Sequence, residues 1–238
     1  MNTKELETAQ EAIEKKIYDI AKANGLVNDD VDPITDGFYD AAKYLDSEKH
    51  ILWVMKEPYD KVEAEKPYGG GWNLARDCFA KDDAWSNRSW QPIIYSMYGL
   101  KYGKLWDDMD WIRDDKSMAN ILQEIAYINV SKIPNMPHSN DGYISECYER
   151  WKSILFEQIS VYNPDVIIFA GTFKHFKKDL LPDLAGKGDI SFENTKAGES
   201  YKWEGKLLLD VYHPNNRTIC REVYVNSIIE AINSFYKK

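Results

Sequence analysis

An unbroken apolar run that ends in a proline constrains this chain more than any other feature. Residues 51–55 (ILWVM) are apolar and favour β structure, and Lys56, Glu57, Pro58 and Tyr59 follow directly. An apolar run without polar alternation is typical of a strand buried on both faces of a parallel sheet. Proline has no N–H to donate, so the strand ends there. We therefore expect a carboxylate and a phenol at the carboxyl end of a buried strand, where open α/β sheets bind ligands.

The same arrangement recurs near the other end of the chain. Residues 207–212 (LLLDVY) lead directly into His213, Pro214, Asn215 and Asn216. The second strand end thus offers an imidazole. Imidazole and carboxylate are the groups that enzymes use most often for acid–base and electrostatic catalysis.

Strand-like and helix-like segments alternate along the whole chain. Apolar runs predict strands at about 50–56, 126–130, 166–170 and 206–212. Helical spacing and turn signals predict helices at about 3–24, 35–46, 73–80, 88–98, 117–124, 144–161, 172–180 and 219–236. This alternation predicts an α/β protein with three α/β/α layers around a central four-stranded parallel sheet. No repeat or linker is visible, which predicts a single domain over 1–238 with a helical N-terminal part at 1–46.

Glycine and threonine give three local signals. Gly25 is expected to end the first helix, and Thr218 to cap the last one. The run 69–71 (GGG) could cradle a phosphate, but it lacks the strand–loop–helix context and the Lys-Ser/Thr pair of a phosphate-binding loop. The run is therefore interpreted as a flexible loop.

Composition limits the classes of function. The formal net charge is −9 and the pI about 5.1, so the chain lacks the overall basic character of a tight non-specific DNA binder. Cys78, Cys147 and Cys220 are far apart, which supports neither a zinc site nor an iron–sulfur cluster, and no metal or cofactor is expected. No apolar run has the length of a membrane span, and no signal peptide is visible, so we expect a soluble cytoplasmic protein without a membrane partner.

The predicted strand ends carry complementary polar groups. They are the Glu57 carboxylate, the Asn129 carboxamide, Thr172 at a helix start, and the His213 imidazole. In a parallel sheet all four ends meet at one edge. A carboxamide offers a donor and an acceptor together, which suits the amide-like edge of a nucleobase.

Four segments, in this order, resemble motifs of the uracil-DNA glycosylase superfamily. They are 55–59 (MKEPY), 127–129 (YIN), 164–171 (PDVIIFAG) and 212–215 (YHPN). The first resembles Gly-Gln-Asp-Pro-Tyr of the best-known branch, and the last resembles its His-Pro-Ser motif. The resemblance covers about 48–236. It implies a glycosylase-like core and base-excision DNA repair, in which the N-glycosidic bond of uracil or a related damaged base is hydrolysed.

The resemblance also implies a role for each matching side chain. Glu57 would position water and stabilise positive charge on the sugar, and His213 would donate to the base as it leaves with negative charge. Asn129 would read the base edge, and Tyr59 would exclude a C5 methyl group. Phe79 would stack on the base.

Nucleic acid would be bound around this site. The base has to leave the helix stack to reach the pocket. The resemblance places Asn215 at the substrate, in the position of the motif's serine. The resemblance implies DNA contacts for Lys56, Lys132, Asn216 and Arg217. A basic rim built from Lys56, Lys132, Lys174 and Arg217 would favour DNA, whereas an acidic rim would favour another partner.

The chain departs from the family pattern at several positions, and alternatives stay open. Met55, Lys56, Glu57 and Asn215 replace Gly, Gln, Asp and Ser of the motifs. One alternative is a non-catalytic module of the same fold that binds a nucleobase, a nucleotide or nucleic acid. Another is a protein-interaction domain that uses the aromatic-rich segment 57–115. The site residues also have plain structural interpretations, such as a solvated acid, a turn cap or a core histidine.

Overall fold

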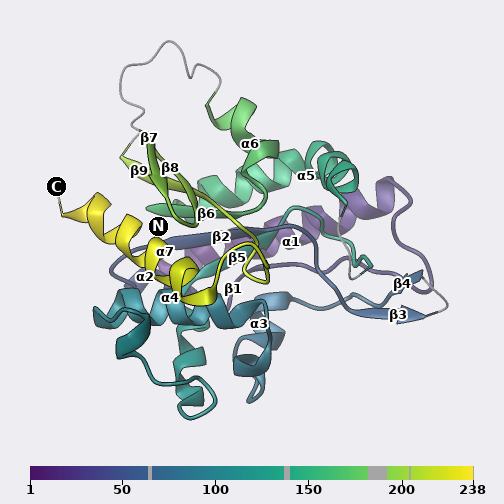
Figure 1. Cartoon of the computed structure of the whole chain (residues 1–238). Helices are drawn as coiled ribbons and strands as arrows, with labels where there is room; N and C mark the ends of the chain where they lie inside the picture. The colour runs from purple at the N-terminus through teal and green to yellow at the C-terminus, as the bar shows by residue number, and fades with distance from the viewer. Residues whose placement is uncertain (64–65, 137–139, 182–191, 204, 238) are drawn as a thin grey trace.

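The fold is built on one twisted sheet with helices on both faces (Figure 1). The structure is a computed structural model that describes residues 1–63, 66–136, 140–181, 192–203 and 205–237. None of the helices in these ranges combines the length and the apolar character that a transmembrane span requires. The predicted α/β class, with helices on both faces of a central sheet, is confirmed.

Within the described ranges, seven strands form the main sheet, in the order β1-β5-β2-β6-β9-β8-β7. The strands are β1 (Gly37–Phe38), β2 (Ile51–Met55), β5 (Ala126–Asn129), β6 (Val166–Ala170), β7 (Phe192–Thr195), β8 (Gly198–Trp203) and β9 (Lys206–Val211). The four predicted strands are β5, β2, β6 and β9, which lie side by side and run parallel. The prediction of a four-stranded sheet was wrong, because β1, β7 and β8 extend it with antiparallel pairs at both sides.

The central strands are buried on both faces, as their composition predicts. Strand β2 sends Trp53 and Met55 to one face and Leu52 and Val54 to the other, and all four are at most 2% exposed. This two-residue alternation divides the core into two hydrophobic layers. One layer packs against helices α3, α4 and α7, and the other against α1, α2, α5 and α6.

The helices mostly begin and end near the predicted residues. They are α1 (Thr3–Ala23), α2 (Ala41–Asp46), α3 (Leu74–Cys78), α4 (Trp90–Tyr102), α5 (Asp141–Tyr162), α6 (Phe173–Leu180) and α7 (Arg221–Tyr236), with short 3₁₀ helices η1 (Ala84–Ser86), η2 (Trp106–Asp108) and η3 (Lys116–Glu124). The prediction of a helix over 35–46 was wrong in its first half. Phe38 pairs with Ala126 there, and helix α2 begins only after Asp40, whose carboxylate accepts from the Lys43 N–H.

Local capping explains the helix ends. Asn2 and Glu5 form a reciprocal capping box at the start of α1, and Gly25 follows its end with φ +65°. Thr218 does not cap α7, because the cap residue is Cys220. Instead, the Asn216 side chain accepts the N–H groups of Thr218 and Ile219.

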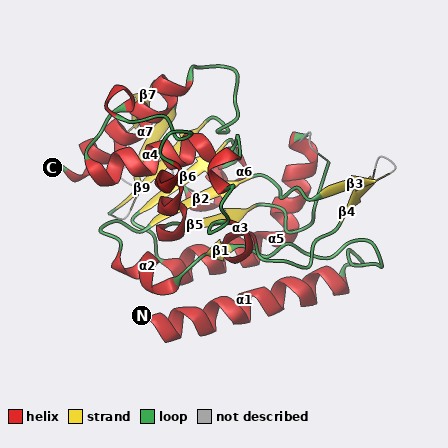
Figure 2. Cartoon of the chain, turned by 90° about the horizontal axis from the view of Figure 1, so that it is seen from below, coloured by secondary structure: helices red, strands yellow, loops and turns green. Residues whose placement is uncertain are grey.

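A small hairpin extends beside the main body (Figures 1 and 2). It consists of β3 (Lys61–Glu63) and β4 (Lys66–Tyr68), and 69–71 (GGG) follows it. The three glycine N–H groups donate to the Asp30 carbonyl, the Asp60 carboxylate and the Pro33 carbonyl. The run is therefore held by hydrogen bonds to the chain itself, and its amides are not directed at a phosphate.

Candidate functional site at the carboxyl edge of the sheet

The ends of β2, β6 and β9 converge as the sequence predicts. A Cβ atom built on Gly171 would lie 3.4 Å from Lys56 Cε and 3.7 Å from the His213 backbone nitrogen. Gly171 has φ +72°, a conformation that favours glycine. The Thr172 hydroxyl donates to the Val54 carbonyl over 2.9 Å and so ties the start of α6 to strand β2. The turn after β6 thus lets the Lys56 and His213 segments approach each other.

The His213 imidazole is held in its neutral form. Burial, and secondarily the nearby Lys56 ammonium, lowers the pKa of His213 to about 4. The Asn215 backbone N–H donates to His213 Nδ1 over 3.2 Å. In the neutral ring the proton then resides on Nε2, so His213 presents an N–H donor at this edge of the sheet.

Asn129 is the second polar group at this edge. It ends β5 opposite Met55 and is 1% exposed. Its backbone N–H donates to Asp36 Oδ2 over 2.7 Å, but its side-chain Nδ2 has no hydrogen-bond partner in the described part of the chain. Leaving a buried amide donor unpaired costs about 1–3 kcal/mol, so this donor is suited to an acceptor supplied by a ligand.

Asn129 and His213 follow strands that are not neighbours in the sheet. Strands β5 and β9 are separated by β2 and β6, and three strand spacings of about 4.8 Å amount to about 14 Å. The strand order therefore places both residues at the same edge of the sheet, with two strands between them.

Glu57 lies on the α5 side of the edge. Burial raises the pKa of Tyr143 and of Cys147, both on α5, and the Glu57 charge adds to both increases. The Tyr143 hydroxyl lies 3.2 Å from Ser131 Oγ, within hydrogen-bond distance. The Glu57 carboxylate is therefore near enough to helix α5 to act electrostatically on a phenol and a thiol.

Lys132 does not contact solvent, so its predicted role in DNA binding was wrong. Its side chain is fully buried, and Nζ lies 2.7 and 2.8 Å from the Asp36 carboxylate oxygens and 2.9 Å from Gln158 Oε1. Burial lowers the pKa of Lys132, while Asp36 opposes that shift. The pair supports the end of β5, since Asp36 also accepts the Asn129 N–H. Sequence spacing gives no signal for this pair, whose members are 96 residues apart.

The predicted stacking role of Phe79 also conflicts with the structure. Phe79 is 1% exposed and makes edge-on contacts with Trp90 and Tyr127 at centroid distances of 5.3 and 5.6 Å. Neither face of its ring is open to a base. Its aromatic neighbours make it a core residue.

The remaining predicted residues lie around the rim. Tyr59 is 55% exposed, and Asn215 and Arg217 are exposed as well. Asn216 lies in the turn after His213 and accepts two backbone N–H groups.

The predicted basic rim is partly neutralised. Lys56 and Lys174 share the Asp141 carboxylate, at 3.8 and 2.5 Å. Lys132 is absent from the rim because it is buried. The charge pattern therefore offers less to a phosphate backbone than the sequence suggests.

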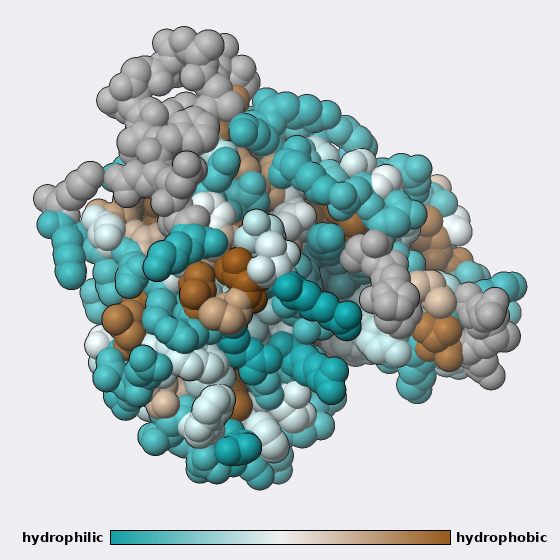
Figure 3. Space-filling view, viewed as in Figure 1, coloured by the Kyte–Doolittle hydropathy of each residue, from teal (hydrophilic) through white to brown (hydrophobic). Residues whose placement is uncertain are grey.

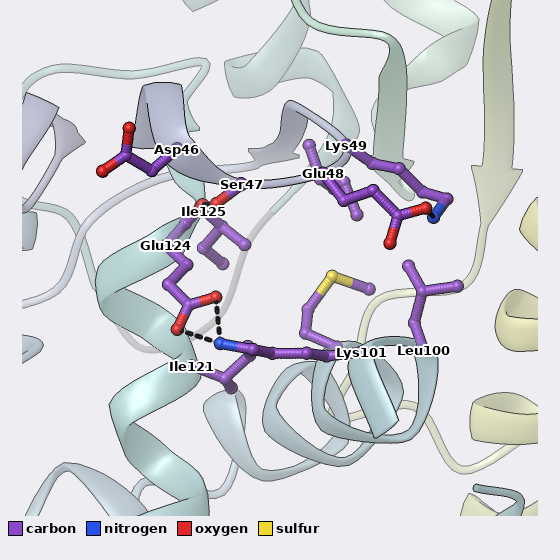
Figure 4. A pocket seen from close by; sticks show the side chains of 11 residues that line it. Asp46, Ser47, Glu48, Lys49, Leu100, Lys101, Ile121, Glu124 and Ile125 are labelled. Carbon is purple, nitrogen blue, oxygen red and sulfur yellow. Dashed lines mark hydrogen bonds and ion pairs between the residues drawn. The ribbon is translucent and has the colours of Figure 1, made fainter. Parts of the chain in front are cut away.

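A separate cavity of about 370 Å³ lies at the opposite edge of the sheet (Figure 4). The Lys101–Glu124 pair, with distances of 2.5 and 2.7 Å, lines one part of it, and the Lys49–Glu48 pair, at 2.6 Å, lines another. Its apolar lining comes from Ile51, Met97, Leu100, Ile121 and Ile125. No local sequence pattern indicates this cavity, because its residues come from three separate segments.

The fold places this chain among the α/β proteins. The chain is an α/β protein with a mostly parallel sheet, whose carboxyl edge gathers a neutral imidazole and a buried carboxamide. Comparison with known protein families and with curated proteins finds no match to this chain. In the described ranges, no group of three or more His, Cys, Asp or Glu side chains is placed to hold a metal ion.

Proposed function

We propose that the carboxyl edge of the sheet recognises a nucleobase and hydrolyses its N-glycosidic bond, as a DNA glycosylase acting on uracil or a related damaged base. The observation that carries the proposal is that two groups occur at the same edge of the sheet. One is the neutral His213 N–H donor, and the other is the buried Asn129 amide, which has no hydrogen-bond partner in the described part of the chain. The order of the four matching motifs in the sequence adds to it.

Each group has a definite task in this proposal. The Asn129 carboxamide donates through Nδ2 to a base carbonyl and accepts a ring N–H through Oδ1. The His213 Nε2–H donates to the other carbonyl, where negative charge develops as the base leaves. The Glu57 carboxylate stabilises the positive charge of the oxocarbenium-like sugar and orients the attacking water.

A second candidate function is base recognition without cleavage. The neutralised Lys56 and Lys174, the buried Lys132 and the net charge of −9 favour it, because they weaken attraction to a DNA backbone. The burial of Phe79 favours it as well, since this ring is closed to a stacked base. Under this alternative the ligand is a free base or nucleotide.

Cleavage of single- and double-stranded oligonucleotides that contain uracil, hypoxanthine or xanthine tests the proposal. We expect abasic product from the wild type and its loss in Glu57→Gln and in His213→Ala. Glu48→Gln is the matched control, because this acid is exposed and lies at the opposite edge of the sheet. We expect it to retain full activity.

Absence of product from every substrate at high enzyme concentration would reject the glycosylase. Binding of uracil and of uridine monophosphate, measured by calorimetry, then tests the second candidate. Saturable binding that Asn129→Asp weakens would support it. Absence of binding would reject a nucleobase site altogether.

A further inference from the structure

The cavity at the amino edge of the sheet has no role in the proposed function. It lies where β2 begins and directly before β5, and its volume is about 370 Å³ (Figure 4). None of the described residues that line it belongs to the candidate site at the carboxyl edge. Pockets for small ligands run from about 300 to 1,000 Å³. The cavity is therefore large enough for a small ligand of its own.

Buried apolar side chains form the inner part of this cavity. Four of them are at most 7% exposed and make up its apolar floor, namely Ile51, Met97, Ile121 and Ile125. Leu100 is partly exposed, and its side chain reaches from α4 toward the loop that carries Glu48 and Lys49 (Figure 4). Such a surface suits the hydrocarbon part of a ligand, because covering it removes apolar area from water.

One of the two ion pairs in the lining is closed. Lys101 Nζ donates to both carboxylate oxygens of Glu124, over 2.5 and 2.7 Å. Each charge of this pair is matched by the other, so together they form a neutral wall. A charged ligand gains little from this side of the cavity.

Lys49 is in a different situation. Its side chain is 16% exposed, and its ammonium lies 2.6 Å from the Glu48 carboxylate and 5.1 Å from the centroid of the Tyr236 ring. The Glu48 side chain is 90% exposed, and Asp46 is exposed as well, so water screens both carboxylates. An ion pair with so well solvated a partner contributes little to stability. Lys49 can therefore exchange Glu48 for the anion of a ligand at little cost.

The loop that carries Lys49 is held in place. The Ser47 hydroxyl lies 2.8 Å from the Lys43 carbonyl oxygen and 3.1 Å from the Glu124 carbonyl oxygen. Lys43 Nζ donates to Gln123 Oε1 over 2.5 Å. These contacts join the loop after α2 to the end of η3, so both walls are formed before a ligand arrives. A preorganised cavity loses less entropy on binding.

We propose that this cavity binds a small aliphatic monocarboxylate. The carboxylate pairs with the Lys49 ammonium in place of Glu48, and the hydrocarbon chain covers the apolar floor. An amine would place its positive charge beside that ammonium. A dicarboxylate would place its second charge on apolar side chains, where an unpaired charge is costly. The proposal does not depend on the glycosylase activity, because the two sites lie at opposite edges of the sheet.

Calorimetric titration of the full chain with butanoate, hexanoate and octanoate tests the proposal. We expect saturable binding and a dissociation constant that falls about fourfold for each added methylene group, which corresponds to about 0.8 kcal/mol. Octylamine and 1-octanol have the same hydrocarbon body with other head groups. Both should bind more weakly than octanoate, because only the carboxylate pairs with Lys49.

Two substitutions at the ion pair should change the affinity for octanoate in opposite directions. Lys49→Met removes the ammonium and keeps the stem, so it should weaken binding about tenfold. Glu48→Gln removes the competing anion, so it should tighten binding by up to about fivefold. Lys104→Met is the matched control, because this half-buried lysine lies 5.8 Å from the Tyr98 ring centroid and outside the cavity. It should leave the affinity unchanged.

The outcomes decide the proposal. Saturable binding of octanoate, with opposite effects of Lys49→Met and Glu48→Gln, would support it. No saturation by octanoate at about 10 mM would overturn it, and so would equal binding of octylamine. Circular dichroism shows whether each variant is folded. If Lys49→Met does not fold, Glu48→Gln decides alone, because it changes an exposed side chain, and unchanged or weaker binding in that variant would refute the assigned contact.

Discussion

Replacing Lys132 with methionine would leave the Asp36 carboxylate buried without a counter-charge. Methionine matches the lysine stem in length, so the change removes the ammonium and little packing volume. Asp36 would keep the N–H groups of Asn129 and Gln158 as donors, at 2.7 and 2.8 Å, but would lose both contacts with Nζ. Breaking a buried pair by removing one partner costs about 3–5 kcal/mol.

That loss is a large share of the roughly 5–15 kcal/mol that stabilises an ordinary domain. Urea unfolding followed by circular dichroism measures it as a lower transition midpoint at constant slope. The joint change of Lys132→Met and Asp36→Asn should recover most of the stability. Without lysine the Gln158 amide can rotate, so that its oxygen accepts from the introduced carboxamide. The oxygen of that carboxamide can still accept the Asn129 N–H.

A double-mutant cycle on these two positions is the critical test. We expect a coupling energy of about 2–4 kcal/mol between them. A Lys132→Met protein within about 1 kcal/mol of the wild type would refute the assigned pairing, and so would additive single changes. Either result would mean that water or local rearrangement solvates Asp36.

Two further perturbations test the turn after β9 and the triglycine run. The pKa of His213 falls from an ordinary 6.5 to about 4 on folding, so the unfolded state takes up the proton first as the pH is lowered. The free energy of unfolding should therefore be highest above pH 6.5 and should fall by about 3 kcal/mol as the pH drops to 4. In urea titrations at several pH values, His213→Asn should flatten this loss. An unchanged acid slope in that variant would contradict the assigned burial. A Cβ on Gly70 would lie 1.9 Å from the Asp32 carbonyl oxygen, so Gly70→Ala should cost more than about 2 kcal/mol in thermal unfolding, whereas Gly103→Ala, with nothing within 4 Å and φ +65°, should cost about 1 kcal/mol. Equal losses at the two glycines would argue against the close approach.

The central sheet could be predicted because its signal is local. Continuous apolar runs such as 51–55 and 166–170 report burial on both faces without knowledge of the partner strands. The edge strands lack such a signal. Strand β1 has two residues, and β8 mixes polar and apolar residues near an edge, where pairing depends on contacts outside the segment.

At the candidate site, too, some features could be predicted from the sequence and others could not. The positions of Asn129 at the end of β5 and of His213 just after β9 could be predicted, because they follow from the parallel topology. The environments of Lys132 and Phe79 were not predictable, since burial of both depends on contacts between segments far apart in the sequence. A lysine after a strand is usually solvated, and only the distant Asp36 stabilises its burial.

On the face shown in Figure 3, apolar side chains occur in small separate groups among hydrophilic ones. This pattern is typical of a protein surface, which always retains scattered apolar atoms. The aromatic residues of the segment 57–115 are divided between the core and the exposed surface.

The attachment of the N-terminal part has a consequence for synthesis on the ribosome. Helix α1 packs against α5, Lys16 pairs with Glu157 at 2.6 Å, and β1 joins the sheet through β5. All of these partners are translated at least about 80 residues after the segments they bind. Helix α1 can contact α2 early, but its packing is completed only when α5 has been translated, at about two thirds of the chain.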